Sequence, residues 1–190
     1  MNSAATAGWS TLLTTALTNS TKSNIEQRLI TEPRTALART SNSPKMSEYR
    51  LVEVDGVEFA ERIHAFNALE SYFPVLKDHH LSDGYWWMVV DANDNHVAFA
   101  GMVPFHPFAG VGFFKRCYVL PDHVGHGLQL RLMCARELKA RQLGFTQLIS
   151  ECLESNAASI TNHRRAGFET FDPEQPWGSR STMYWTKTLS

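Results

Sequence analysis

Several features that mark other protein classes are missing from this chain. No stretch of its 190 residues stays apolar over the length that a helix needs to cross a bilayer. Cysteine is scarce, and its three copies, Cys117, Cys134 and Cys152, form no Cys-x-x-Cys spacing and cannot all pair. The sequence therefore predicts no membrane span and no disulfide framework, and it favours buried, reduced thiols in a cytoplasmic protein.

An excess of positive charge is absent from most of the chain. Residues 1–45 hold five basic and two acidic side chains, whereas residues 46–190 hold 13 basic and 17 acidic ones, a net charge of −4. A net-acidic domain presents no electrostatic footprint for nucleic acid. We therefore expect a small-molecule or peptide partner, and neither nucleic acid nor a membrane.

The composition changes near residue 46. Residues 1–45 are rich in Ser, Thr, Ala and Asn, contain one aromatic residue, Trp9, and show no sustained apolar period. Three interpretations fit this segment: a disordered extension, an acid-poor targeting peptide, or a translated region that precedes a start at Met46. The first and third are favoured, because a secretory signal needs a continuous apolar stretch. Residues 46–190 are expected to form a single domain.

Segments with strand-like and helix-like patterns alternate along that domain. The pattern predicts a mixed α/β fold, α+β in character, with a largely antiparallel central sheet of about six to seven strands and helices on both faces. One helix is expected to bury Leu128, Leu132, Ala135 and Leu138. The expected strands cover residues 49–54, 85–90, 97–103, 111–120, 148–152 and 183–187, and the expected helices cover residues 57–69, 74–80, 128–143 and 157–166.

A glycine-bearing turn between an expected strand and an expected helix is the most informative segment. Residues 119–129 read Val-Leu-Pro-Asp-His-Val-Gly-His-Gly-Leu-Gln. Glycine lets main-chain N–H groups approach an anion, and the first N–H groups of a helix have no partner within the helix. The turn therefore predicts a phosphate-bearing ligand, although such a turn can also serve local chain geometry alone.

Two other functions of this turn, metal binding and ATP binding, have less support in the sequence. Asp122, His123 and His126 straddle it, but the spacing supplies no further ligand, so no metal is expected. ATP binding is a weak alternative, because the Gly-Lys-Ser/Thr ending of a P-loop is absent.

A second block lies at residues 156–168 and reads Asn-Ala-Ala-Ser-Ile-Thr-Asn-His-Arg-Arg-Ala-Gly-Phe. With the turn, from which one helix and one strand separate it, this block resembles the GNAT superfamily of acetyl-CoA-dependent N-acetyltransferases. The resemblance extends from about Tyr49 to the C-terminus. It departs from the family pattern at Val124, where Arg or Gln is usual, and at Gln129, where Gly or Ala is usual.

The resemblance implies a fold in which acetyl-CoA lies between two splayed central strands. It implies that the pantetheine arm pairs with the backbone of one strand, that the pyrophosphate binds the amides of the turn, and that an asparagine contacts the arm from the other side. The corresponding cofactor-binding residues are Cys117, Tyr118, Val119, Val124, Gly125, His126, Gly127, Leu128, Gln129, Leu130 and Asn156.

The resemblance also implies direct attack of an amine on the thioester in a ternary complex. The family often uses a tyrosine seven residues after the asparagine to protonate the departing thiolate, and here His163 holds that place, on the same helix face as Asn156. His163 is therefore the candidate general acid, unless it only packs on the helix. Glu151 and Glu154 are candidate bases, and Tyr118 or a water chain are alternatives.

The predicted function is acetyl transfer to a primary amine of a small molecule or peptide. The alternative is a non-catalytic acyl-CoA sensor or interaction module on the same fold. An antibiotic, a polyamine, an amino acid and a protein N-terminus all remain open as acceptors, and Lys115 and Arg116 are candidates to attract an acidic group on the acceptor. Residues 66–84, 104–110 and 173–178 are expected to set specificity, and a homodimer is conceivable.

Overall fold

The computed structural model describes residues 48–106 and 108–189. The expected extension over residues 1–45 therefore lies outside the described residues. The strands are β1 (Arg50–Val54), β2 (Tyr85–Val90), β3 (His96–Pro104), β4 (Val111–Val119), β5 (Gln147–Leu153), β6 (Glu169–Phe171) and β7 (Thr182–Thr188). The helices are α2 (Ala60–Leu69), α3 (Asp78–Ser82), the 3-10 turn η2 (Pro121–His123), α4 (Leu128–Gln142) and α5 (Ala157–Arg165).

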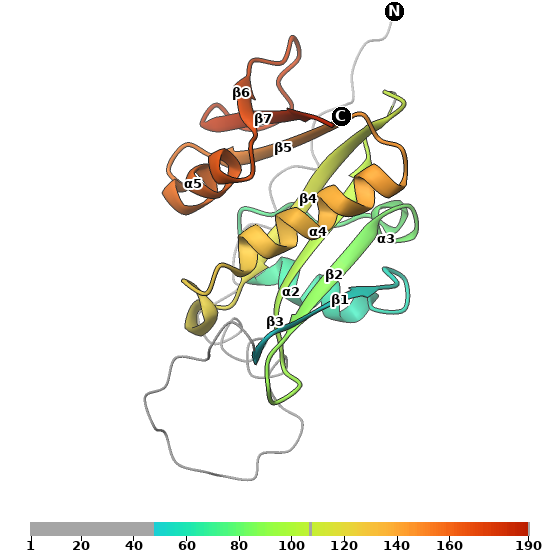
Figure 1. Ribbon diagram of the computed structural model, residues 1–190, viewed down its shortest axis with the longest axis vertical. Coiled ribbons are helices and arrows are strands. Elements are labelled where there is room, and N and C mark those ends of the chain that lie inside the picture. The colour runs from blue at the N-terminus through green and yellow to red at the C-terminus, as the bar shows by residue number, and fades with distance from the viewer. Residues whose placement is uncertain (1–47, 107, 190) are drawn as a thin grey trace, which may run out of the picture.

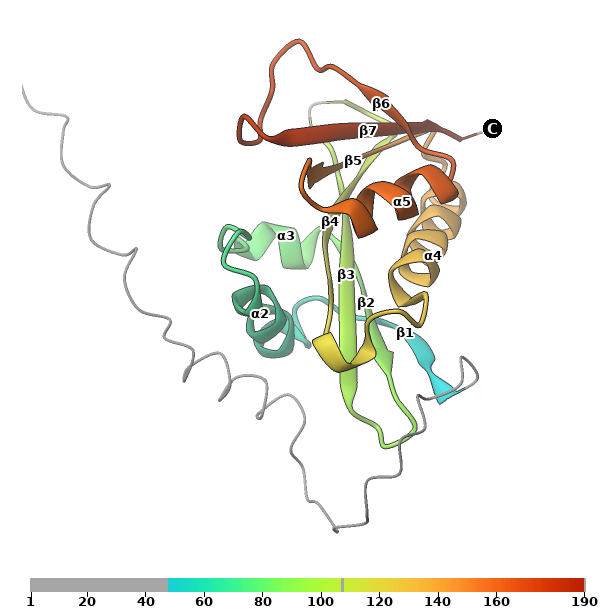
Figure 2. The same ribbon diagram turned by 90° about the vertical axis from the view of Figure 1, so that its left-hand side faces the viewer.

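All seven strands belong to one sheet, in the order β1-β2-β3-β4-β5-β7-β6 (Figure 1). Every neighbouring pair is antiparallel except β4 and β5, which are parallel. Helices α2 and α3 lie on one face of the sheet, and α4 and α5 lie on the other (Figure 2). The expected mixed, largely antiparallel sheet with helices on both faces is confirmed. Within the described residues, no helix has the length and apolar character of a membrane span.

Buried aromatic rings join α2 to the centre of the sheet. Phe66 of α2 stacks on Phe99 of β3 with ring centroids 5.3 Å apart, and Phe99 in turn stacks on Trp86 of β2 at 6.1 Å. All three side chains are fully buried. Burial of such large apolar surfaces is the main stabilising contribution in a domain of this size.

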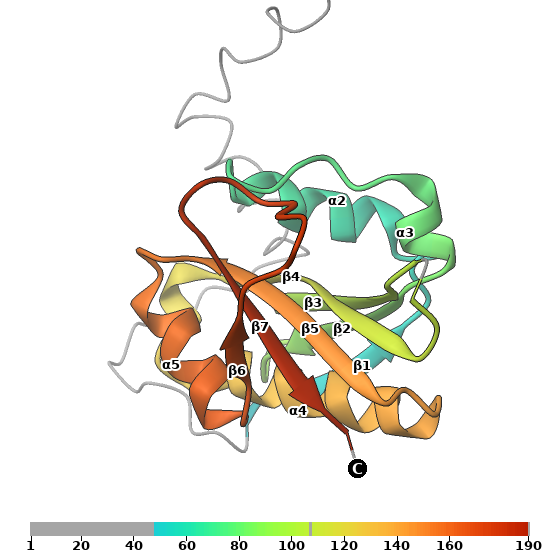
Figure 3. The same cartoon turned by 90° about the horizontal axis from the view of Figure 1, so that it is seen from above.

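The sheet divides at its only parallel pair. Strand β4 pairs with β5 only through residues 111–113 opposite residues 147–149, and beyond these residues the two strands separate. Seen from above, β5 and β7 cross the direction of β3 and β2 (Figure 3). On its other edge β4 continues to pair with β3 up to Val119. The sheet is therefore continuous at one end of the β4–β5 pair and open at the other.

A bulge in β4 lies beside this opening. Ala100 pairs with Cys117 and Gly101 with Lys115, so Arg116 is the extra residue, and its φ is +60°. A bulge bends its strand and interrupts the ladder, which leaves main-chain groups in need of other partners.

Arg136 of α4 supplies those partners. Its side chain is 2% exposed, and its Nη1 donates to the carbonyl oxygens of Gly101 and Arg116, at 3.3 Å each. Its Nε donates to the carbonyl of Leu132, and the guanidinium lies 4.0 Å above the centre of the Phe114 ring. Burial lowers the pKa of Arg136 to about 10, so the side chain remains charged at neutral pH. A charged side chain thus fastens α4 to the bulge.

The structure corrects some local expectations. Leu138 is 59% exposed, because α4 buries the face that carries Leu128, Leu132, Met133, Arg136 and Ala140. The first short helix after α2 is α3, four residues later than expected at its start, and the short strand β6 was not expected. All three cysteines are free, but of the three thiols expected to be buried only Cys152 is, whereas Cys117 is partly buried and Cys134 is exposed.

We predict that replacing Arg136 by methionine destabilises the domain. Each buried carbonyl that loses its donor costs about 1–3 kcal/mol, so the two bulge carbonyls predict a loss of about 2–4 kcal/mol in unfolding free energy, offset in part by the gain from removing a buried charge. Urea unfolding followed by tryptophan fluorescence measures this change. Arg164→Met, at an exposed position of α5, is the matched control, and equal stabilities of the two variants would contradict the role of Arg136.

Candidate active site

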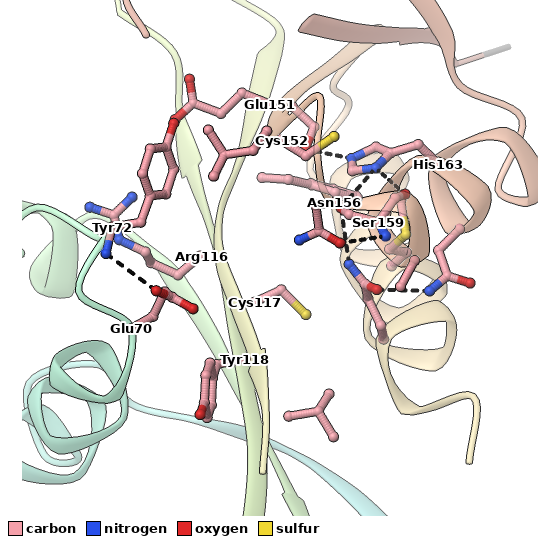
Figure 4. Close-up of a pocket in the computed structure, with 18 of the residues that line it drawn as sticks. Glu70, Tyr72, Arg116, Cys117, Tyr118, Glu151, Cys152, Asn156, Ser159 and His163 are labelled. Carbon is pink, nitrogen blue, oxygen red and sulfur yellow. Dashed lines mark hydrogen bonds between the residues drawn. The ribbon is translucent and has the colours of Figure 1, made fainter. Parts of the chain in front are cut away.

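A cleft of about 960 Å³ opens where β4 and β5 separate. Its walls come from both strands, the turn before α4, helix α5, the α2–α3 loop and the loop before β7. Figure 4 shows Glu70, Tyr72 and Arg116 on one side of this cleft, and Asn156, Ser159 and His163 on the other. The side chain of Glu151 extends from β5 toward the side that carries Tyr72.

The facing edges of β4 and β5 line the cleft where the two strands no longer pair with each other. Cys117, Tyr118 and Val119 of β4 line the cleft beyond the last β4–β5 pair, and Cys152 and Leu153 line it from β5. The outer edges of these two strands are already paired, to β3 and to β7. An extended ligand with amide groups can add to such an edge as a further strand.

The turn before α4 forms one end of the cleft. Gly125 and Gly127 have φ values of +92° and +70°, a region that other residues avoid. Within the described chain, the main-chain N–H groups of residues 125–130 donate to no other residue. Free amides at the start of a 15-residue helix, together with its dipole, can bind an anion.

Side chains from other elements hold this turn in place. The Tyr49 hydroxyl lies 2.9 Å from Nδ1 of His123, the Tyr49 ring lies 5.6 Å from the ring of His126, and Arg131 donates to the Tyr49 carbonyl. His123 and His126 thus pack on an aromatic residue. Among the described residues, no three His, Cys, Asp or Glu side chains are grouped to hold a metal ion.

Gln129 connects α4 to α5 across the cleft. Its Oε1 accepts a hydrogen bond from Asn162 at 2.7 Å, and its Nε2 donates to the Ser159 hydroxyl at 3.3 Å. Asn156 begins α5, where its Oδ1 accepts from the Ser159 amide at 2.9 Å. This cap leaves the two N–H donors of the Asn156 side chain for a ligand in the cleft.

His163 is 4% exposed and lines the cleft from α5. Its Nδ1 lies 2.8 Å from the carbonyl oxygen of Ser159, and because a carbonyl only accepts, Nδ1 carries the proton. Its Nε2 then accepts from the Ser150 hydroxyl at 2.8 Å. The ring stacks on Trp185, and burial lowers the pKa of His163 to about 4, so the imidazole is neutral at pH 7.

Glu151 carries a carboxylate oxygen with no protein partner. Its Oε2 is buried, and within the described residues it makes no hydrogen bond. Burial raises the pKa of Glu151, and a hydrogen bond from Trp177 and the charges of Lys115 and Arg116 partly oppose this rise. A partly dehydrated carboxylate with a free oxygen is suited to accept a proton. Glu154, by contrast, is exposed at the end of the strand and does not line the cleft.

The structure gathers most of the predicted site residues in this cleft. Nine of the eleven residues expected to bind the cofactor line it, together with His163 and Glu151. The exceptions are His126, which packs on Tyr49, and Leu130, whose amide is free. Their predicted roles in binding and catalysis stay predictions.

The sequence analysis missed three residues that support the site. Ser150 bonds to His163, Tyr49 supports the glycine turn, and Arg136 fastens the bulge. Of the three, only Arg136 could have been noticed in the sequence. It follows Leu128 and Leu132 at helical spacing, so it is a charged residue on a helix face that should be apolar.

Comparisons with known proteins agree with this geometry. The model of the acetyltransferase (GNAT) family matches residues 51–168. An uncharacterized N-acetyltransferase of Schizosaccharomyces pombe is 30% identical over 86 residues, which are 43% of this chain and 52% of the relative, so the match spans about half the length of that protein.

Solved structures show the same fold at low sequence identity. The ribosomal-protein-S18-alanine N-acetyltransferase of Escherichia coli matches with a TM-score of 0.60 at 16% identity, over 75% of this chain and 94% of the other. A GNAT acetyltransferase of Staphylococcus aureus gives 0.61 at 11%, over 75% and 99%. The spermidine N-acetyltransferase of Vibrio cholerae, a dodecamer, gives 0.58 at 13%, over 75% and 94%. By its matched residues and its fold, this chain belongs to the GNAT acetyltransferase family.

Proposed function

We propose that the chain transfers an acetyl group from acetyl-CoA to a primary amine of a small molecule or peptide, by direct attack in a ternary complex. The observation that carries this proposal is the cleft between β4 and β5, which has free turn amides at one end and, in its wall, the Glu151 carboxylate, whose buried Oε2 has no partner among the described residues. The three free thiols suit a reducing, cytoplasmic compartment. A homodimer also stays a prediction.

The residues of the cleft fit the parts of acetyl-CoA. The amides of residues 125–130 would hold the pyrophosphate, the cleft-lining stretch of β4 at Cys117 to Val119 would pair with the pantetheine arm, and Asn156 would bind the arm from α5. Val124 and Gln129 differ from the residues usual in the family, but these differences leave in place the main-chain N–H groups that this binding needs. When bound, acetyl-CoA supplies the thioester whose acetyl carbon the amine attacks.

The protein must then hold the amine and move one proton from it. We assign this role to Glu151, because Oε2 needs a donor and the amine supplies N–H groups. Positioning both reactants in one cleft supplies much of the rate enhancement in such a reaction.

The proton donor to the departing thiolate is His163 in this proposal, acting beside Ser150. The neutral imidazole has its only N–H on Nδ1, directed at the Ser159 carbonyl, so it can act on a thiolate at neutral pH only through rearrangement of this hydrogen-bonded chain. This arrangement is the observation that favours the second candidate, a non-catalytic acyl-CoA sensor on the same fold.

Thiol release from acetyl-CoA in the presence of an amine panel tests the proposal. We expect acceptor-dependent turnover, and Glu151→Gln should lower kcat by about 10²- to 10⁴-fold, the range for loss of a general base. Glu154→Gln is the matched variant, and the larger loss identifies the base. Tight binding of CoA with no turnover for any amine would favour the sensor instead.

The turn can be tested separately from catalysis. Gly127→Ala should lower the affinity for CoA, because φ is +70° and an alanine there strains the turn by about 1–2 kcal/mol or displaces its amides. Gly144→Ala is the matched control: Gly144 lies just beyond the other end of α4 and has a φ of +75°, and a Cβ added there, as at Gly127, meets no other atom within 4 Å. Calorimetric titration with CoA should therefore show a loss of affinity for Gly127→Ala alone, with similar losses of stability in both variants.

The role of Glu151 also predicts a pH dependence. A base must be ionised, so kcat/KM should rise with pH through the pKa of Glu151, which burial raises. Trp177→Phe keeps an aromatic ring but removes the hydrogen bond that lowers this pKa, so the rising limb should move to higher pH. The pH profiles of the two proteins with one amine measure this shift, which the titration of the amine itself does not affect. Superimposable profiles would count against Glu151 as the base.

A further inference from the structure

Aromatic surfaces stand partly uncovered at the Glu151 end of the cleft. Tyr72, from the α2–α3 loop, and Trp177, from the loop before β7, both line the cleft, and each is 39% exposed. Phe73, Phe113 and Phe114 also line it and are covered to a greater degree. Large aromatic side chains that face a cleft and stay uncovered mark a surface that a ligand can cover.

Hydrogen bonds and ring contacts fix these walls. The Trp177 ring lies 4.5 Å from that of Tyr184, and the Tyr184 hydroxyl accepts from the Gly178 amide at 2.8 Å. The Tyr72 hydroxyl lies 3.3 Å from Oγ1 of Thr182 on β7. The two aromatic residues are therefore held before any ligand arrives, which reduces the entropy that binding costs.

One polar group stands among these rings. The Trp177 side chain lies near enough to the Glu151 carboxylate to lower its pKa, and the buried Oε2 of Glu151 has no protein partner within the described chain. A buried carboxylate oxygen without a donor is unfavourable, so a ligand that supplies an N–H group there is favoured.

The charged residues near Glu151 limit which further charged groups the acceptor can carry. Lys115 and Arg116 flank Glu151, so a second positive charge on the ligand meets repulsion there. The Arg116 guanidinium already donates to Asn67 Oδ1 at 2.9 Å and to the Pro74 carbonyl at 3.0 Å, and it lies over the ring of Phe73, which lowers its value as a partner for an acidic ligand.

From these observations we infer that the acceptor is a primary amine carried on a flat aromatic group, with no second charge. The ring lies between Tyr72 and Trp177, and the amine meets Oε2 of Glu151. This inference rests on the proposed function and adds to it the chemical class of the acceptor. It narrows the range of acceptors that the sequence left open, which included polyamines and amino acids.

A panel of four amines tests the inference by thiol release. 2-Phenylethylamine carries the aromatic ring and one charge, butylamine lacks the ring, phenylalanine adds a carboxylate, and spermidine adds positive charges. We expect kcat/KM for 2-phenylethylamine to exceed that for each of the others by about tenfold, the upper range for one aromatic contact. Turnover that is fastest with spermidine or phenylalanine overturns the inference but leaves the proposed acetyl transfer intact.

Two variants locate the preference. Trp177→Ala should remove most of the advantage of 2-phenylethylamine over butylamine and leave the KM for acetyl-CoA unchanged. Phe108→Ala is the matched control, because Phe108 stacks on Phe105 nearby but is 62% exposed and does not line the cleft. A preference that survives Trp177→Ala, or that Phe108→Ala removes equally, overturns the inference.

Calorimetry keeps the inference testable if no amine is acetylated. The CoA-loaded protein should bind 2-phenylethylamine about tenfold more tightly than butylamine, and Trp177→Ala should remove this difference. Equal affinities for the two amines overturn the inference, whereas absent turnover with selective binding overturns the proposed catalysis alone.

Discussion

The separation of β4 from β5 is the constraint on which the site depends, and a buried arginine fastens the β4 bulge that lies beside it. The bulge at Arg116 frees main-chain carbonyls in the middle of the sheet, and Arg136 binds them from α4. Because α4 also begins with the glycine turn, the same helix fixes the bulge and presents the free amides. One helix thus joins the bulge beside the cleft to the turn amides that can bind an anion.

The cleft combines two ends of opposite character. The turn before α4 gathers N–H donors and the positive end of a helix dipole, which suit a phosphate. The other end holds Glu151, whose free oxygen is buried and whose neighbours include Trp177, Lys115 and Arg116. A ligand that spans both ends must be anionic at one end and place its reactive part beside a carboxylate at the other, as the family's cosubstrate does.

His163 occupies the sequence position that the family gives to a proton donor, but its contacts in the structure are also those of a packing residue. Its place in the sequence, seven residues after Asn156, predicts a proton donor in the cleft, and the structure does place it in the wall. Hydrogen bonds to Ser150 and Ser159, and stacking on Trp185, also make it a neutral, buried part of the packing between α5 and the sheet. Spacing along a helix predicts which face a side chain occupies, but not the strand residues that meet it there.

The sequence by itself determined the alternation of strands and helices, the glycine turn and the helix that follows it, because apolar period and glycine are local signals. It placed Leu138 in the core wrongly, since α4 buries the face that carries Arg136, two of whose partners are carbonyls on β3 and β4. Only the tertiary structure decided that Glu151 keeps a free buried oxygen, that Tyr72 and Trp177 face one cleft, and that β4 leaves β5 after Phe113. These features arise from contacts between segments far apart in the chain, which no local pattern encodes.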